Sequence, residues 1–247
     1  LSSSSAASDV YKRQVNWLCP SHPDNLILER ESMLEVVRDY DVDGIHFDYI
    51  RYPNGDCCYC DGCRQRFQEQ TGHLVADWPG DCYNGALAVE YRQWRAEQIT
   101  RLVRAVSTEA HQIKPDLQVS AAVFSNYPGC VDSVGQDWLA WVDDGSLDFI
   151  CPMDYTSDFE RFRSLVSTQL GRVAGSIPLY PGIGATAGAS ALSSDGVIAQ
   201  ILIARRQGAT GFVVFNYSAA MAEQVLPDLA KGTTAPLSAS VGGLWTY

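Results

Sequence analysis

The strongest constraint on the fold is a regular alternation of short apolar strands with amphipathic helices. Each strand is a nearly continuous run of branched and aromatic residues, and each is followed by a segment with helical periodicity. The five predicted strands cover residues 44–50, 117–124, 147–153, 177–184 and 211–217. Buried strands that alternate with helices form a parallel sheet covered by helices. The sequence therefore predicts an α/β domain.

Two α/β architectures fit this alternation, an open doubly wound sheet and a (β/α)8 barrel. The open sheet of dinucleotide-binding proteins uses a G-x-G-x-x-G turn after a strand, and the sequence contains no such turn. Polar and aromatic residues instead follow the strand ends, namely Asp48, Asn126, Asp154, Tyr155 and Tyr217. That placement is typical of a barrel, whose chemistry lies at the C-terminal ends of its strands.

Composition limits the class of partner. The chain has 29 acidic and 18 basic residues, so its net charge of -11 argues against nucleic acid. Twelve tyrosines and six tryptophans suit sugars, whose C–H faces stack on aromatic rings while carboxylates accept their hydroxyls. No apolar run approaches the roughly 18 residues of a membrane span. We expect a carbohydrate ligand, with no organic cofactor and no membrane span.

The segment "DGIHFDYIRYP" at residues 43–53 carries the main catalytic candidate. Side chains alternate along a strand, so Ile45 and Phe47 share one face while His46 and Asp48 share the other. The apolar face suits the helix-packed outside of a barrel, which points His46 and Asp48 inward. A buried charge is costly unless it is paired or used. Asp48 is therefore predicted to be catalytic, and the alternative is an Asp48–Arg51 ion pair that only fixes the loop.

Extended to "DYDVDGIHFDYIRYP", this segment resembles the glycosyl-hydrolase-like family 10 proteins, a group of predicted bacterial (β/α)8 glycoside hydrolases. The pieces "WLCPSHP", "VGQDW", "LDFICPMDYT" and "GFVVFNYS" agree with that resemblance in order, which covers about residues 17–220. The resemblance implies that the strand bearing Asp48 is the fourth of the barrel. The chain would then hold strands four to eight with their helices, and the first three strands would be missing.

The resemblance also implies the activity. A full-length parent would cleave O-glycosidic bonds in a polysaccharide, either a cell-wall or an environmental glycan, outside the cytoplasm, and this fragment alone would be inactive. The alternative is a barrel that binds carbohydrate without cleaving it. Side chains expected to contact the sugar are His46, Arg51, Tyr52, Asn126, Tyr155 and Tyr217.

Glycoside hydrolysis needs two carboxyl groups, and the second is harder to find. No glutamate lies at a strand end, which leaves Asp154, although strand alternation would turn it away if Met153 and Tyr155 face inward. The strand is also similar to the D-G-x-D-x-D-x-E pattern of glycoside hydrolase family 18. Ile50 stands where that family has its acid glutamate, so chitinase-type proton donation is excluded.

The cysteines suggest a metal site. Cys58, Cys60 and Cys63 form a C-x-C-x2-C motif, and thiolates this close can wrap one Zn²⁺. The motif resembles one in β-galactosidases of family 42, where an upstream cysteine joins it. That resemblance implies Cys19 as the fourth ligand of a structural zinc, with Cys57 and Cys82 as rivals. The alternative is free thiols or disulfides in an extracytoplasmic protein.

The ends of the chain differ from its middle. Residues 1–14, "LSSSSAASDVYKRQ", lack the features of a signal peptide and resemble a tail that recurs in translated metagenomic reads. We expect a non-native tail there, and the alternative is a disordered Ser/Ala-rich arm. The barrel domain is predicted at 15–231 and a linker at 232–247.

Overall fold

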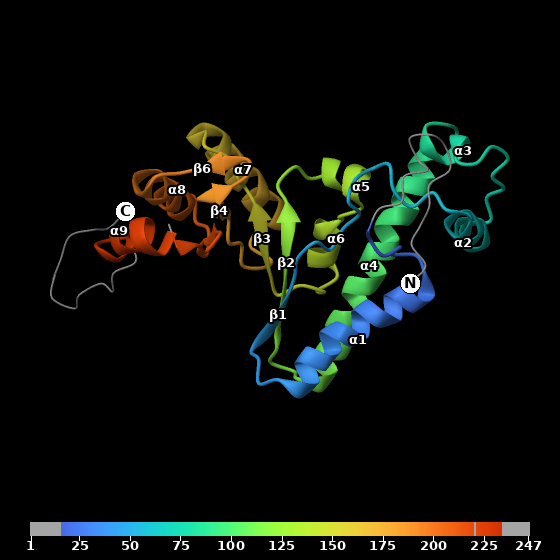
Figure 1. Ribbon diagram of the computed structural model, residues 1–247, viewed down its shortest axis with the longest axis horizontal. Coiled ribbons are helices and arrows are strands. Elements are labelled where there is room, and N and C mark those ends of the chain that lie inside the picture. The colour runs from blue at the N-terminus through green and yellow to red at the C-terminus, as the bar shows by residue number, and fades with distance from the viewer. Residues whose placement is uncertain (1–15, 220, 234–247) are drawn as a thin grey trace. The chain divides into compact units, whose positions relative to one another are not determined.

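The computed structural model describes residues 16–219 and 221–233 (Figure 1). The tail predicted at 1–14 and nearly all of the linker predicted at 232–247 lie outside the described residues. The chain divides into two compact units. The first unit comprises Leu1–Pro152 and Gln169–Leu179, and the second comprises Met153–Thr168 and Tyr180–Tyr247.

The first unit is built on a three-stranded sheet. Its strands are β1 (Gly44–Phe47), β2 (Gln118–Phe124) and β3 (Phe149–Met153), adjacent in that order. β1 and β2 are parallel, and a parallel bridge joins Ile150 of β3 to Leu179. These parallel strands, joined by helical crossovers, confirm the predicted α/β fold.

Helices precede and connect the strands of this sheet. Most connect consecutive strands, and the last of them, α7, has residues in both units. The helices are α1 (Pro23–Asp39), α2 (Asp61–Thr71), α3 (Gly80–Tyr83), α4 (Ala88–Ile113), α5 (Gly129–Val134), α6 (Trp138–Asp143) and α7 (Phe159–Val173). α1 and α4 lie side by side (Figure 1) and bury Val37 and Val103 in the same core as Ile45 and Phe47.

The two faces of β1 differ as the alternation predicts. Ile45 and Phe47 are buried in the core, whereas His46 and Asp48 are exposed. On β2 the residues Val119 and Ala121 are likewise fully buried against the helices. The opposite face of the sheet therefore holds the polar side chains of the candidate site.

The second unit has its own small sheets. β4 (Gly182–Gly184) pairs in parallel with β7 (Val213–Phe215), and β5 (Thr186–Ala187) pairs antiparallel with β6 (Ser190–Ala191). Its helical segments are α8 (Ser194–Arg206), the π-helical turn η1 (Met221–Val225) and α9 (Leu226–Ala230).

Two local expectations differ from the structure. The strand predicted at 177–184 is interrupted, because Pro178 and Pro181 supply no N–H for a continuous ladder. Residues 53–85, which their many cysteines and glycines predict to be a long loop, contain the helices α2 and α3. α2 buries only Cys63 and Phe67, so its apolar periodicity is too sparse to be read from the sequence. No helix of the described residues is both long and apolar enough to cross a membrane.

Candidate active site and cysteine cluster

A cavity of about 360 Å³ opens at the C-terminal end of β1, within the first unit. Its polar and aromatic lining includes Trp17, Glu29, His46, Asp48, Tyr49 and Arg51. Four of these residues come from the end of β1 and the turn that follows it. The sequence-predicted residues His46, Asp48 and Arg51 are thus brought to one cavity.

Asp48 lies at the rim of this cavity with its carboxylate exposed. One oxygen, Oδ1, accepts a hydrogen bond from the backbone N–H of Tyr49 at 2.8 Å. No ion pair joins Asp48 to Arg51 in the part of the chain that the structure describes. The alternative in which Asp48 only anchors the loop through Arg51 therefore has no support in this geometry.

Arg51 is held by aromatic rings. Its guanidinium carbon lies 5.7 Å from the ring centre of Trp17, 4.9 Å from that of Tyr49 and 5.1 Å from that of Phe124. Its Nη1 donates to the carbonyl of Tyr52 at 3.1 Å, while the Trp17 Nε1 donates to the carbonyl of Arg51 at 3.3 Å. Cation–π contacts and hydrogen bonds thus fix the Arg51 guanidinium in the cavity lining, together with the rings of Trp17 and Tyr49.

The backbone is strained at two positions, one after Asp48 and one in the cysteine motif. Tyr49 and Cys58 have φ values of 55° and 67°, a region that side chains with a Cβ rarely adopt. Such strain persists only where the surrounding structure enforces it, and it gathers at functional sites. Here it falls at the turn after Asp48 and inside the cysteine motif.

His46 is tied to the neighbouring strand. Its Nδ1 lies 2.8 Å from the Oγ of Ser120, its cross-strand partner. Partial burial lowers the pKa of His46, although the nearby Asp48 carboxylate opposes that shift. Ser120 gave no functional signal in the sequence, because it sits within the apolar run "LQVSAAVF".

Tyr52 and Asn126 do not share one environment. Tyr52, expected to contact sugar, is instead fully buried at 0% exposure, with the Arg95 guanidinium 4.3 Å from its ring centre. It packs the core beneath the loop, so its side chain has no surface to offer a ligand. Asn126 is exposed, two residues past the end of β2.

The remaining predicted residues belong to the second unit. Tyr155 stacks on Phe215 with ring centres 5.2 Å apart, and Tyr217 is 79% exposed beyond the end of β7. Asp154 is fully buried, at 0% exposure. Asp48 and Asp154 therefore differ in environment and fall in different units.

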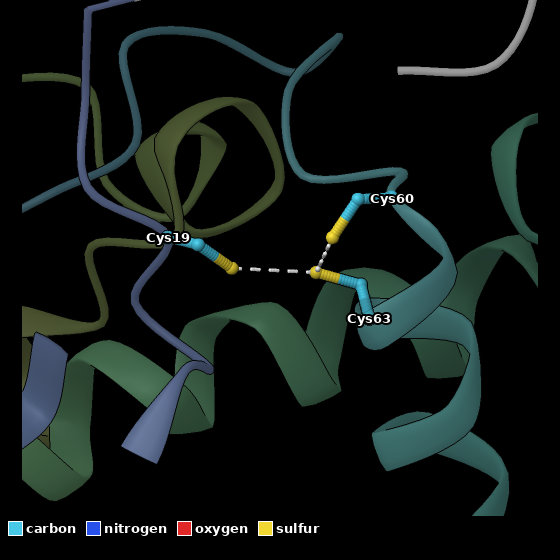
Figure 2. Close-up of side chains that lie close together, drawn as sticks. All are labelled: Cys19, Cys60 and Cys63. Carbon is cyan, nitrogen blue, oxygen red and sulfur yellow. Dashed lines mark hydrogen bonds between the residues drawn. The ribbon is translucent and has the colours of Figure 1, made fainter. Parts of the chain in front are cut away.

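Three of the four predicted cysteine ligands, Cys19, Cys60 and Cys63, place their sulfurs within 4.8 Å of one another, and the fourth, Cys58, approaches Cys19. The Sγ of Cys19 lies 3.5 Å from that of Cys63 and 3.8 Å from that of Cys58, and the sulfurs of Cys60 and Cys63 are 3.4 Å apart. Figure 2 shows Cys19, Cys60 and Cys63 pointing toward one another, from the segment before α1 and from the start of α2. These three distances all exceed the roughly 2.05 Å between the sulfurs of a disulfide.

The pKa values of the clustered thiols are shifted by the hydrogen bonds between them. Hydrogen bonds from Cys58, Cys60 and Cys63 hold the pKa of Cys19 far below its usual range. The same bond to Cys19 raises the pKa of Cys60, because Cys60 must remain the donor. Hydrogen bonds from neighbouring thiols thus stabilise a thiolate at Cys19.

The cluster has polar neighbours. The Ser21 Oγ lies 3.4 Å from the sulfurs of both Cys19 and Cys63. Arg66 donates through Nη2 to the Ser21 Oγ at 3.0 Å, and the same nitrogen lies 3.8 Å from the Cys19 sulfur and 3.9 Å from the Cys63 sulfur. No pattern in the sequence pointed to Arg66, because only folding brings α2 beside residues 19–21.

The rival cysteines have other surroundings. The Cys57 thiol donates to the Oδ1 of Asn54 at 3.1 Å, and burial raises the pKa of Cys82 to about 12. Neither belongs to the group of sulfurs around Cys19.

Solved structures show which fold these units match. The glycoside hydrolase domain of PgaB (BpsB) from Bordetella bronchiseptica aligns with a TM-score of 0.67 at 16% identity, over 83% of this chain and 60% of that one. The β-galactosidase of Bacillus circulans sp. alkalophilus aligns with a TM-score of 0.61 at 16% identity, over 83% and 36%. The β-galactosidase of Marinomonas ef1 gives 0.64 at 10% identity, over 87% and 41%. The chain thus has the α/β fold of these glycoside hydrolase structures but spans 60% or less of their length.

Sequence comparison identifies the family. No curated protein sequence matches the chain. A model of the family described as Glycosyl hydrolase-like 10 matches residues 3–174, which are 172 of the 247 residues. The match includes the Asp48 strand, the cysteine motif and β2, and it confirms the resemblance seen in the sequence. The protein therefore belongs to the glycosyl hydrolase-like 10 family.

Proposed function

We propose that this protein hydrolyses O-glycosidic bonds in a polysaccharide, with Asp48 as a catalytic carboxylate. The observation that carries the proposal is the exposed Asp48 carboxylate at a strand end, in a cavity whose walls include Trp17 and Tyr49. Family membership supports hydrolysis, and the aromatic walls suit a sugar ring. Strand ends are where barrel enzymes place their catalytic groups.

The other lining residues would bind and orient the sugar. His46 and Arg51 offer a ring nitrogen and a cation within hydrogen-bonding reach of the cavity. Tyr155, Tyr217 and Asn126 remain proposed contacts at the ends of the later strands. We do not extend this role to Tyr52, because its ring packs against the Arg95 guanidinium in the hydrophobic core of the first unit.

The second carboxyl group is proposed to be Asp154, which follows β3 directly. One carboxyl group would protonate the leaving oxygen, and the other would act as nucleophile or base. Substituting Asp154 with Asn tests this separately from Asp48.

The five parallel segments of the chain are proposed to be strands four to eight of a (β/α)8 barrel. The parallel pairings of β1 with β2 and of β4 with β7, with helices between successive strands, support this assignment. On this view activity requires all eight strands, so the 247-residue chain by itself is inactive.

The natural substrate is proposed to be a bacterial cell-wall glycan or an environmental glycan that the enzyme meets outside the cytoplasm. The net charge of -11 and the aromatic cavity walls support a polyhydroxylated ligand over a polyanion.

A structural Zn²⁺ held by Cys19, Cys58, Cys60 and Cys63 is also proposed. Four thiolates around one zinc at about 2.3 Å place neighbouring sulfurs about 3.8 Å apart. Three of the six sulfur pairs, at 3.4, 3.5 and 3.8 Å, support this requirement, and the sulfurs of Cys19, Cys60 and Cys63 lie within 4.8 Å of one another. When bound, zinc would cross-link the chain before α1 to the loop after β1. Arg66 would partly offset the net negative charge of a tetrathiolate site.

The proposed activity is tested by assaying the hydrolysis of a panel of polysaccharides. The assay uses a longer protein that contains this chain together with the first three strands of the proposed barrel. Asp48→Asn should lower turnover by roughly 10²–10⁴-fold without changing the circular dichroism spectrum. Asp43→Asn is the matched control, because Asp43 precedes β1 at the opposite end of the strand. Near-normal turnover of Asp48→Asn would remove Asp48 from catalysis.

The second candidate is a barrel that binds carbohydrate without cleaving it. The observation that favours it is that Asp48 is the only strand-end carboxylate lining the cavity in the described residues. Oligosaccharide binding that Asp48→Asn leaves intact, with no cleavage of any glycan by the wild type, would favour this candidate.

A further inference from the structure

His46 and Ser120 form a cross-strand pair on the sheet face that also carries Asp48. The register places their Cα atoms opposite each other in the parallel pairing of β1 and β2. The His46 Nδ1 and the Ser120 Oγ are 2.8 Å apart, a normal hydrogen-bond distance. Ser120 is only 2% exposed, so water does not compete for this bond.

The serine hydroxyl has a second neighbour that constrains its proton. Its Oγ lies 3.5 Å from the carbonyl oxygen of Ile45, which can only accept. A hydroxyl that donates to this carbonyl presents its oxygen to the imidazole as an acceptor. The ring proton then lies on Nδ1, which leaves the lone pair on Nε2.

The second ring nitrogen of His46, Nε2, is the one left for a ligand of the cavity. His46 is exposed and lines it, and Nε2 has no hydrogen-bond partner among the described residues. Partial burial lowers the pKa of His46, which favours the neutral ring and so preserves this lone pair. Asp48, two residues along, lies about 6.6 Å further down the strand, given a rise of roughly 3.3 Å per residue.

We propose that Ser120 is a positioning residue that fixes His46 with Nε2 as an acceptor, and that the sugar unit bound beside Asp48 donates a hydroxyl or amino hydrogen to it. This inference rests on the proposed function for its ligand. Its structural half, the orientation and tautomer of the ring, stands without any substrate.

The first test is nuclear magnetic resonance of the chain labelled with ¹⁵N-histidine at about pH 7.5, where a His46 ring with a lowered pKa is neutral. There are four histidines, and the His46 signals are those lost in His46→Gln. We expect a protonated Nδ1 and an unprotonated Nε2. In Ser120→Ala the two nitrogens should shift toward the averaged values of a ring that exchanges between tautomers. Ser120→Thr, which keeps the hydroxyl, should restore the wild-type pattern.

Ser107→Ala is the matched control, because Ser107 is also a buried serine beside a histidine, His111 on α4. It should leave the His46 signals unchanged. A wild-type ring that is averaged or protonated on Nε2, or a ring unaffected by Ser120→Ala, would overturn the positioning role.

The second test uses steady-state kinetics on a glycan that the longer protein cleaves. Ser120→Ala should lower kcat/KM by roughly three- to tenfold, the worth of one hydrogen bond, mainly through KM. Unchanged kinetics alongside an altered ring would refute the sugar contact. Failure to cleave any glycan would instead overturn the proposed function, while the resonance experiment still decides the role of Ser120.

Discussion

At the scale of single residues, Arg95 shows how one buried cation holds the loop that follows β1. Its guanidinium is 1% exposed and donates to the carbonyls of Asn54 and Gly55 at 2.9 and 3.1 Å. Arg95→Lys keeps the charge but loses the planar fork, so we expect a loss of about 1–3 kcal/mol in the free energy of unfolding. Urea unfolding measures it. Arg101→Lys on the exposed side of α4 is the control, and equal stability of the two variants would contradict the role of Arg95.

A second prediction for a single residue concerns His46 and the pH dependence of the free energy of unfolding. Burial holds its folded-state pKa below the unfolded value near 6.5, against the pull of Asp48. Below about pH 6.5 the unfolded chain therefore binds more protons than the folded one at this position, and stability falls as the pH drops toward the folded pKa. His46→Gln should weaken that loss. Urea unfolding between about pH 5 and pH 8 measures it, and identical slopes for wild type and variant would refute the assignment.

At the scale of elements, cysteine sulfurs bring the loop after β1 and helix α2 into contact with Cys19, the residue that precedes α1 by four positions. If zinc joins Cys19 to the motif that opens α2, Cys60→Ser should lose the metal and lower the melting temperature by roughly 4–8 °C for a loss of about 2 kcal/mol. Metal analysis and thermal unfolding check this. Cys57→Ser is the control, because the Cys57 thiol bonds Asn54 and lies outside the cluster. Metal-free wild-type protein, or equal metal content in Cys60→Ser, would remove the zinc.

At the scale of the whole molecule, β7 leaves an apolar row exposed. Val213 and Phe215 are each 41% exposed at alternate positions of β7, and Tyr217, two residues past the end of the strand, is 79% exposed. Such a row promotes association, so the 247-residue chain should gain mass with concentration in sedimentation velocity. Val213→Thr with Tyr217→Ser should reduce that gain. Val89→Thr, at a 55% exposed position on α4, should not, and a wild-type monomer at every concentration would contradict the prediction.

Features that depend on the local order of residues along the chain could be predicted from the sequence. The alternation in "GIHFDYI" separated Ile45 and Phe47 from His46 and Asp48, because a strand turns successive side chains to opposite faces. The spacing of Cys58, Cys60 and Cys63 indicated a shared site, because residues this close in sequence can meet without any tertiary fold. The family followed from the same short motifs.

Features that depend on distant residues came only from the tertiary structure. Nothing in the sequence places Arg66 beside Cys19, or Ser120 against His46, since these contacts span 47 and 74 positions. Tyr52 looked like a ligand residue because it follows the strand that bears Asp48, yet it is buried and its ring packs against Arg95. Local periodicity determined which face each side chain occupies, and only the packing of helices on the sheet decided which neighbours it meets, because burial depends on the whole fold.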